Sequence, residues 1–213
     1  RKPDLVQILD QAGGYQVPLN EGNQDKQEYK HGIVDGYKVF HYEERIRIAR
    51  EIVTASLIIT AVFDQNLSDV AETLAIAVRE CKLAGRTEPL NVIACENMMN
   101  SSSILGKYVM NLLQEDDREY AAAHFGFPDC MISRVVPIPA LDPLKIVTEN
   151  YNEWTVRRET FLGEKPSGLD ALELVDNQTA RLERKLFIHN GGHAVCGYMG
   201  FHRGWKYIHE AVA

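Results

Sequence analysis

A lysine, an amide and an imidazole lie close together in one short segment, Glu183 to His193. The residues are Lys185, Asn190 and His193, and the apolar run Leu186-Phe187-Ile188 follows the lysine directly. A lysine acts as a base near neutral pH only when desolvation or a neighbouring cation lowers its pKa, and an apolar wall can supply the desolvation. Asn190 can donate to an oxygen that gains negative charge, and His193 can orient a hydroxyl. The segment therefore predicts a site that moves a proton to or from a hydroxyl group.

Each of these residues also has a plainer interpretation. A lysine in a helix is usually a solvated surface residue, and Asn190-Gly191-Gly192 is typical of a helix C-cap. His189 and His193 share a helix face at a spacing that can hold a metal, but the residues between them lack the glutamate of zinc proteases. We therefore expect no catalytic metal. On a continuous helix the lysine, the amide and the imidazole would fan over more than a third of the circumference, so we expect a bend at the two glycines.

Buried strands that alternate with helices must position such a site. The apolar patterns predict strands at Tyr15–Leu19, Gly36–Tyr42, Ser56–Phe63 and Leu90–Cys95, and helices at Asp4–Ala12, Glu43–Val53, Ser68–Leu83 and Ile104–Leu113. The polar stretch Asn20–His31 is expected to be a hairpin loop. Later patterns predict strands within Met131–Val136 and Lys145–Val156, and a helix from about Leu172 with Asp176 or Asn177 as its cap.

This order of elements favours crossover connections and a mostly parallel sheet. We expect a Rossmann-like α/β domain with an added antiparallel portion over residues 1–171, incomplete at its N-terminus, and the beginning of a helical catalytic domain over 172–213. Ligands bind beyond the carboxyl ends of parallel strands, and two motifs fall at such ends. From these motifs we expect four residues to contact a cofactor: Thr60, Ala61, Val62 and Glu96. A helix N-cap is the plainer use of Glu96-Asn97.

Composition excludes several classes of function. The 213 residues carry a formal net charge of −7, which does not favour binding to nucleic acid or to an anionic membrane. No apolar run reaches the roughly 20 residues of a membrane span, and the opening Arg-Lys-Pro-Asp is no signal peptide, so we expect a cytoplasmic protein. The four cysteines have no short paired spacing, and we expect them to be reduced and buried. The chain looks like a piece of a larger protein.

Several segments together resemble the polyol-specific long-chain dehydrogenases of the mannitol dehydrogenase family, most closely its mannitol-1-phosphate dehydrogenases. The resemblance covers essentially the whole chain and is clearest in Pro89–Met98, Asp142–Leu144, Asn152–Trp154 and Glu183–Gly200. It implies an N-terminal Rossmann-like domain that binds NAD, a mainly helical C-terminal domain that supplies a catalytic lysine, and a sugar in the cleft between them. The implied reaction is the interconversion of mannitol 1-phosphate and fructose 6-phosphate.

The resemblance also assigns roles to individual residues. Lys185 matches the family's general base, and Asn97 and Asn190 match the two amides that stabilise the substrate oxygen. His193 matches the histidine that contacts the polyol. These roles agree with the chemistry, because oxidation of a polyol needs a base for the hydroxyl proton, donors for the developing alkoxide and an acceptor for the hydride.

The chain departs from the family pattern at three places. It contains no glycine-rich turn for a pyrophosphate, as though it began just beyond the second strand of the domain. Phe63 stands where the family often has glycine, and Ser133 stands where many relatives carry an aspartate. The group that would hold the anion of the substrate is open, with Lys107, Arg134 and Arg203 as candidates.

Two rival functions follow from these departures. One is a relative that reduces a sugar acid such as tagaturonate or fructuronate, because the Lys-Asn-His set is shared. The other is a non-catalytic piece that retains the fold alone. Other enzyme templates do not match, since the chain has no tyrosine followed four residues later by lysine and no Gly-x-Ser-x-Gly.

Overall fold

The computed structural model describes residues 3–20, 30–134, 144, 146, 148–149 and 152–211. The described helices are α1 Pro3–Ala12, α2 Arg45–Ile52, α3 Leu67–Leu83, α4 Ser101–Leu112, α5 Glu115–His124, α6 Gln178–Glu183 and α7 Gly191–His202. The strands are β1 Gly14–Asn20, β2 Lys30–Asp35, β3 Leu57–Thr60, β4 Leu90–Ala94, β5 Phe125–Gly126, β6 Cys130–Ser133, β7 Thr148–Glu149, β8 Glu153–Arg157 and β9 Leu172–Val175. A π-helical segment, Arg184–Asn190, joins α6 to α7.

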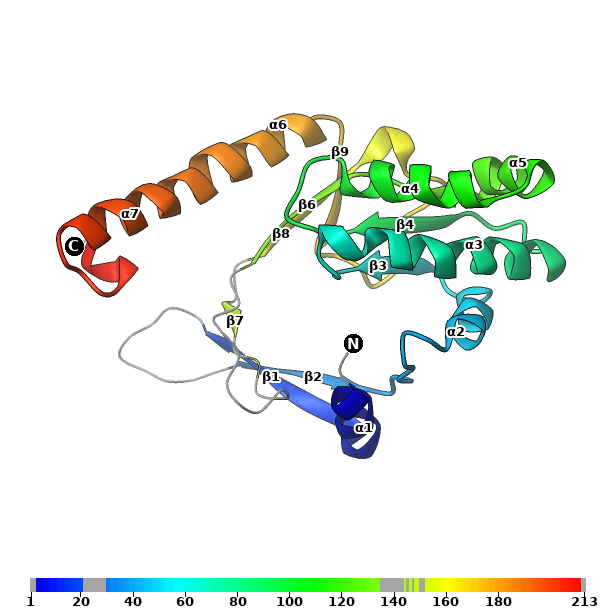
Figure 1. The fold of residues 1–213 in the computed structure, drawn as a ribbon, viewed down its shortest axis with the longest axis horizontal. Helices are drawn as coiled ribbons and strands as arrows, with labels where there is room; N and C mark the ends of the chain where they lie inside the picture. The colour runs from blue at the N-terminus through cyan, green and yellow to red at the C-terminus, as the bar shows by residue number, and fades with distance from the viewer. Residues whose placement is uncertain are drawn as a thin grey trace.

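The strands form three small sheets. The sheet β3-β4-β5 is wholly parallel, with Thr60 opposite Ala94 at its carboxyl end. In the sheet β6-β8-β9 the first pair is antiparallel and the second is parallel. The hairpin of β1 and β2 carries β7 on its outer side and lies apart from the other two sheets (Figure 1). A parallel core with an antiparallel addition is the architecture that the sequence predicted.

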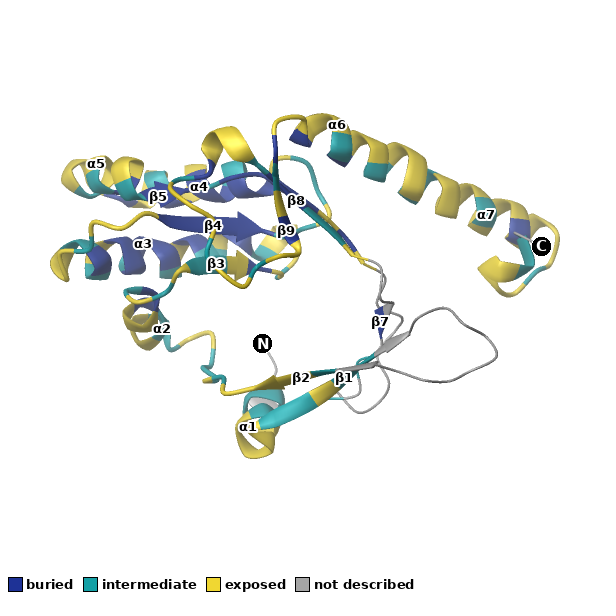
Figure 2. Ribbon diagram, turned by 180° about the vertical axis from the view of Figure 1, so that it is seen from behind, coloured by how far each residue is buried: buried dark blue, intermediate teal, exposed yellow. Residues whose placement is uncertain are grey.

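Strand β4 is the middle strand of the parallel sheet and is buried along its whole length. Its side chains alternate between two apolar clusters, as a strand with both faces covered requires. Leu90, Val92 and Ala94 pack with helices α2 to α5, whereas Ile93 packs with Val156 and other residues of the second sheet. Figure 2 shows this burial, with α3 and α4 presenting their buried faces to β4. The carboxyl end of β4 is therefore held firmly in place.

Two secondary-structure expectations were wrong, and one helix was not predicted. Gly36–Tyr42 contains no strand. The second strand is β2, which pairs with β1 in antiparallel register and ends at Asp35, opposite Gly14. Leu172–Val175 is a strand, because it pairs in parallel with β8. Helix α5 was missed, since only Ala121 of its ten residues is buried and its apolar pattern is weak. Parts of Asn20–His31, Met131–Val136, Asp142–Leu144 and Lys145–Val156 lie outside the described residues.

The last part of the chain is one long helical rod. Helix α6, the π-helical segment and α7 follow one another from Gln178 to His202, and the rod runs away from the sheets (Figure 1). Large apolar side chains on it are exposed to solvent, among them Phe187, Tyr198 and Phe201. In the part of the chain that the structure describes, no helix combines the length and the apolar character that crossing a membrane requires.

Candidate active site at the carboxyl ends of strands β3 and β4

Glu96 ties the ends of the two parallel strands together. Its two carboxylate oxygens accept hydrogen bonds from the backbone N–H groups of Val62 at 2.8 Å and Phe63 at 2.9 Å. The hydroxyl of Thr60 lies 3.4 Å from the same carboxylate, and the N–H of Cys95 donates to the Thr60 carbonyl at 2.9 Å. Charge-assisted bonds of this kind are strong. Glu96 therefore shapes the turn 61–63, where the sequence places the cofactor contacts Thr60, Ala61 and Val62.

Phe63 holds a backbone conformation that normally belongs to glycine. Its φ of 65° and ψ of 151° lie in a region that side chains with a Cβ rarely enter. The ring makes little compensating contact, because Phe63 is 75% exposed. The hydrogen bond to Glu96 is what holds the residue there. The turn therefore has a glycine-like shape although a phenylalanine occupies the position.

We expect Phe63→Gly to be more stable than Phe63→Ala by about 1 kcal/mol. Both variants remove the exposed ring, but only the alanine variant keeps a Cβ and with it a backbone strain of about 1–3 kcal/mol. The greater conformational entropy of glycine in the unfolded state offsets part of the advantage of the glycine variant. Urea unfolding of the two variants measures the difference directly. An alanine variant that is equally stable would show that the turn relaxes out of this conformation.

The start of α4 fixes the other side of the same strand end. The Ser101 hydroxyl donates to the Ala94 carbonyl at 2.6 Å, and the Ala94 N–H donates to the Ser102 hydroxyl at 2.9 Å. The carboxylate of buried Asp129 accepts from the N–H and the hydroxyl of Ser103 at 2.9 and 2.6 Å, which caps the helix. Sequence reasoning did not find Asp129, because the capping carboxylate comes from 26 residues farther along the chain.

Lys185 and Asn97 meet although they are 88 residues apart in the sequence. The lysine Nζ donates a short hydrogen bond to the Asn97 Oδ1, across the space between the helical rod and the end of β4. This contact leaves the Asn97 Nδ2 group as a donor for another oxygen. Burial lowers the pKa of Lys185 from its usual value near 10.5. A half-buried lysine with a lowered pKa beside a free amide donor can accept a proton and stabilise the oxygen that loses it.

The π-helical segment brings Asn190 onto the same side of the rod as Lys185. In an α-helix, two residues five positions apart differ by about 140° beyond a full turn, so Lys185 and Asn190 would point in different directions. In a π-helix the backbone bonds join residues five positions apart, so Asn190 lies about one turn above Lys185. His193 follows Asn190 by three positions in α7 and stays near that face. The expected bend at the glycines is absent, because Gly191 is helical at φ −61° and ψ −44°; the wider π turn produces the alignment instead.

The two histidines of this helix contact each other. The rings of His189 and His193 pack edge to face at 4.6 Å, and the His193 Nδ1 lies 3.1 Å from the His189 carbonyl oxygen. Within the described residues, no three His, Cys, Asp or Glu side chains gather closely enough to hold a metal. The exposed His193 ring retains its Nε2 atom for a hydroxyl of a ligand.

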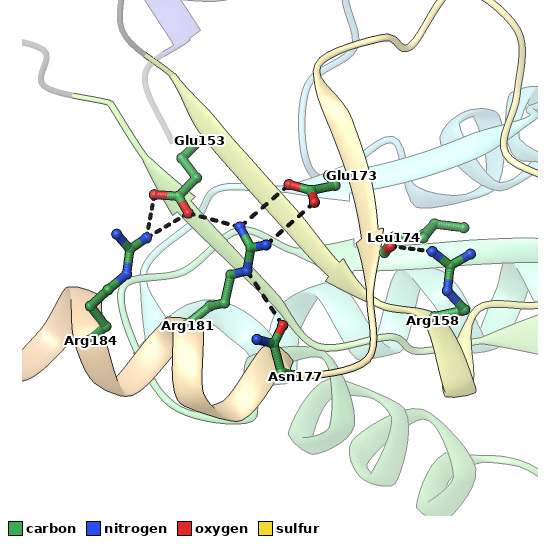
Figure 3. Close-up of polar contacts among 7 residues, drawn as sticks. All are labelled: Glu153, Arg158, Glu173, Leu174, Asn177, Arg181 and Arg184. Atoms are coloured by element: carbon green, nitrogen blue, oxygen red, sulfur yellow. Dashed lines mark hydrogen bonds and ion pairs between the residues drawn. The ribbon is translucent and has the colours of Figure 1, made fainter.

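Glu153 anchors the rod to the second sheet. As Figure 3 shows, its carboxylate lies between the guanidinium groups of Arg184 and Arg181. Arg184 donates to both Glu153 oxygens at 2.6 and 2.7 Å, and Arg181 reaches Glu153 at 3.3 Å and Glu173 at 3.4 Å. The Glu153 side chain is only 17% exposed, so loss of either partner would leave a charge unpaired at a partly desolvated site. Because Arg184 immediately precedes Lys185, the anchor sets where the lysine stands. Sequence reasoning gave Glu153 no role, since neither spacing nor composition pairs it with the helix.

We expect Glu153→Ala to destabilise the protein by about 1–3 kcal/mol, the cost of removing hydrogen bonds to charged groups at a largely buried site. Glu159→Ala is the matched control, because Glu159 is exposed on a short helical turn, and it should change stability by less than about 0.5 kcal/mol. Chemical denaturation provides both values. Equal effects of the two substitutions would contradict the anchor.

A cavity of about 690 Å³ opens beside the β3 strand end. It is lined by Thr60, Ala61, Val62 and Phe63 together with apolar residues of α2 and α3. Its size and mainly apolar wall are typical of small-molecule sites. Of the candidate anion-binding residues, Lys107 lies on α4, Arg134 directly after β6, and Arg203 after α7, where it stacks on Trp205. The far end of α7 is remote from α4 (Figure 1), so Lys107 and Arg203 do not converge.

Comparison with known proteins gives consistent results. The sequence profile described as the mannitol dehydrogenase Rossmann domain matches residues 2–168. Mannitol-1-phosphate 5-dehydrogenase of Thermoanaerobacter pseudethanolicus is 32% identical over 212 residues, which cover 98% of this chain and 53% of that protein. The protein of the same name from Bacillus velezensis is 38% identical, over 98% of this chain and 54% of its own length. The chain thus spans about half the length of the curated relatives it matches.

Solved structures show the same fold. The mannitol 2-dehydrogenase of Pseudomonas fluorescens, solved as a ternary complex with NAD and D-mannitol, aligns with a TM-score of 0.76 at 16% identity, over 99% of this chain and 52% of that one. A D-sorbitol dehydrogenase in substrate-free form aligns with a TM-score of 0.74 at 13% identity, over 94% and 51%. These likenesses establish the Rossmann-like architecture that the sequence predicted.

Proposed function

The chain belongs to the mannitol dehydrogenase family, and from this membership we propose that it carries the catalytic lysine of an NAD-dependent oxidoreductase that interconverts mannitol 1-phosphate and fructose 6-phosphate. The contact between Lys185 and Asn97 is the observation that carries this proposal. It joins the helical rod to the strand end where a Rossmann-like domain binds its ligands. Burial, which lowers the pKa of Lys185, prepares the lysine for proton transfer.

In the proposed reaction, Lys185 takes the proton of the polyol hydroxyl. The Nδ2 group of Asn97 and the amide of Asn190 donate to the oxygen as negative charge develops on it. His193 contacts another hydroxyl of the polyol and orients the chain of the sugar. In the reverse direction, protonated Lys185 gives its proton to the ketone oxygen. Lys185 and Asn97 hold each other in place before any substrate arrives, which reduces the cost of positioning them.

NAD fits the strand end as far as the described residues reach. The cavity beside β3 has room for part of a dinucleotide. The hydrogen bonds to the Glu96 carboxylate fix the backbone of residues 61–63, which lines this cavity. We propose that Thr60, Ala61 and Val62 contact the cofactor directly and that Glu96 shapes their turn. NAD, when bound, supplies the acceptor for the hydride.

Two further expectations stay predictions from the sequence. They are the division of the chain into a cofactor-binding part, residues 1–171, and the beginning of a helical catalytic domain, residues 172–213, and a location in the cytoplasm. The partners that we propose are small molecules, a polyol or a sugar phosphate.

A substrate comparison on the whole protein tests the function. NADH formation should be detected with mannitol 1-phosphate in the presence of EDTA, since the proposed chemistry needs no metal. In the oxidation direction, free mannitol should have a lower kcat/KM than mannitol 1-phosphate. In the reduction direction, tagaturonate and fructuronate should have a lower kcat/KM than fructose 6-phosphate. A preference for a sugar acid would replace the proposed substrate, and activity restored only by zinc would overturn the metal-free mechanism.

A further inference from the structure

Two cysteine thiols lie side by side at the carboxyl end of β4. The Sγ atoms of Cys95 and Cys130 are 3.9 Å apart, and the Cys130 thiol also lies 3.3 Å from the Ala94 carbonyl oxygen. Cys130 is 2% exposed and belongs to the cluster around Ile93, whereas Cys95 is half-buried and packs against that cluster. Cys95 is therefore the more exposed residue of the pair, and Cys130 lies beside it within the apolar cluster.

We propose that Cys95 and Cys130 are a redox-active pair that forms an intramolecular disulfide when a peroxide or a low-molecular-weight disulfide oxidises them. A disulfide has an S–S length of about 2.05 Å, so the sulfurs must approach by about 1.9 Å from their present 3.9 Å separation. Rotation about the Cα–Cβ bonds and a small movement of the loop after β4 can supply this approach, since the bond from the Cys95 N–H to the Thr60 carbonyl is the last backbone bond to β3 there.

The reaction balances with hydrogen peroxide as the oxidant. The Cys95 thiolate attacks one peroxide oxygen, the O–O bond breaks, and hydroxide leaves as a sulfenic acid forms on Cys95. The Cys130 sulfur then attacks the Cys95 sulfur, and the sulfenic oxygen departs as water with the Cys130 proton. Two thiols are oxidised to one disulfide, and one peroxide is reduced to two molecules of water.

The surroundings of the pair favour this order of events. The hydrogen bond from Cys130 lowers the pKa of the Cys95 thiol, whereas that same bond and burial raise the pKa of Cys130. The Glu96 carboxylate raises the pKa of both thiols, and the Asp129 carboxylate raises that of Cys130 in addition. Cys95 is therefore the more acidic and more accessible thiol, as the thiol that attacks an oxidant should be.

The pair is next to the residues of the candidate active site. Cys95 directly precedes Glu96, which holds the turn 61–63, and Asn97, which contacts Lys185. Drawing Cys95 toward Cys130 pulls on both residues, so oxidation should weaken the contact between Asn97 and Lys185. This consequence rests on the proposed function, but formation of the disulfide does not.

Peptide mapping of the 213-residue chain tests the disulfide. After treatment with hydrogen peroxide or oxidised glutathione, non-reducing digestion should release a linked peptide that contains Cys95 and Cys130, and dithiothreitol should remove the link. Cys81→Ser and Cys196→Ser are the matched controls and should retain the linked peptide. Cys95→Ser and Cys130→Ser should lose it, and Cys130→Ser should accumulate a Cys95 sulfenic acid that dimedone traps.

Two results would overturn the proposal. One is oxidation of the folded wild-type chain to a product in which Cys95 stays a thiol or links to a residue other than Cys130. The other is a Cys130→Ser variant in which Cys95 does not react with peroxide. In the whole protein, a disulfide that forms without any change in turnover would refute only the coupling to the active site. A reduced protein that shows no turnover, yet still forms the disulfide on oxidation, would refute the proposed function and leave the redox pair standing.

Discussion

Replacing Lys185 with alanine in the whole protein should lower the turnover number for mannitol 1-phosphate oxidation by about 10²- to 10⁴-fold, the usual contribution of a positioned general base. Affinity for NAD should change little, because the proposed cofactor contacts lie at the strand ends and not on the helical rod. The oxidation rate of the unmodified protein should rise with pH through the lowered pKa of Lys185, since only the neutral amine accepts a proton. That pH dependence should disappear in the variant.

Two comparisons separate catalysis by Lys185 from a structural role. Lys38→Ala removes an exposed lysine that pairs with Glu51, and it should leave both turnover and the pH profile unchanged.

Lys185→Met keeps the length of the side chain without the amine. Because the unfolded lysine keeps its higher pKa, the unfolded state binds more protons and the charged lysine lowers stability at neutral pH. Lys185→Met should therefore be at least as stable as the parent at pH 7 and yet lose turnover to the same extent as Lys185→Ala. Near-normal turnover with an unchanged pH profile would show that the family resemblance extends to the fold alone.

Asn97→Asp should lower the oxidation rate at neutral pH by about 10- to 10³-fold. The substitution places a carboxylate against the Lys185 amine, and an opposite charge at such a distance raises the pKa of a lysine by about 1–3 units. A raised pKa keeps Lys185 protonated, so the rising limb of the pH–rate profile should move to higher pH by the same amount. The variant also loses the Nδ2 donor, which lowers the maximal rate further.

The control for this substitution is Asn111→Asp, which adds the same charge on the exposed face of α4. It should move the pH profile by far less, because solvent screens a distant charge. Asn97→Ala completes the set, since it removes the donor without adding charge and should reduce the rate with little displacement of the profile toward higher pH. If the profile of Asn97→Asp stays in place, Lys185 is not the group that titrates.

Apolar periodicity and residue type determined much of this protein from the sequence. Strand β4 and helix α3 were predicted within one or two residues, because each buries a continuous set of apolar side chains and such sets leave a clear pattern. The family resemblance named Lys185 and Asn97 as residues of one site, and the structure brings the two side chains into contact, while their catalytic roles stay predictions. Strand β9 was missed, because its partner β8 and not its own pattern makes it a strand.

Tertiary structure alone decided how the site is held. The Glu153 anchor and the Asp129 cap join residues that are 26 to 31 positions apart, and no local pattern records such a pairing. The π-helical turn that aligns Asn190 with Lys185 depends on backbone bonds that side-chain types do not specify. Cys95 and Cys130 lie close together because the end of β4 and the beginning of β6 meet in the fold. The sequence determined which chemical groups are present, whereas their distances and exposure, and hence the pKa of Lys185, exist only once distant segments have packed together.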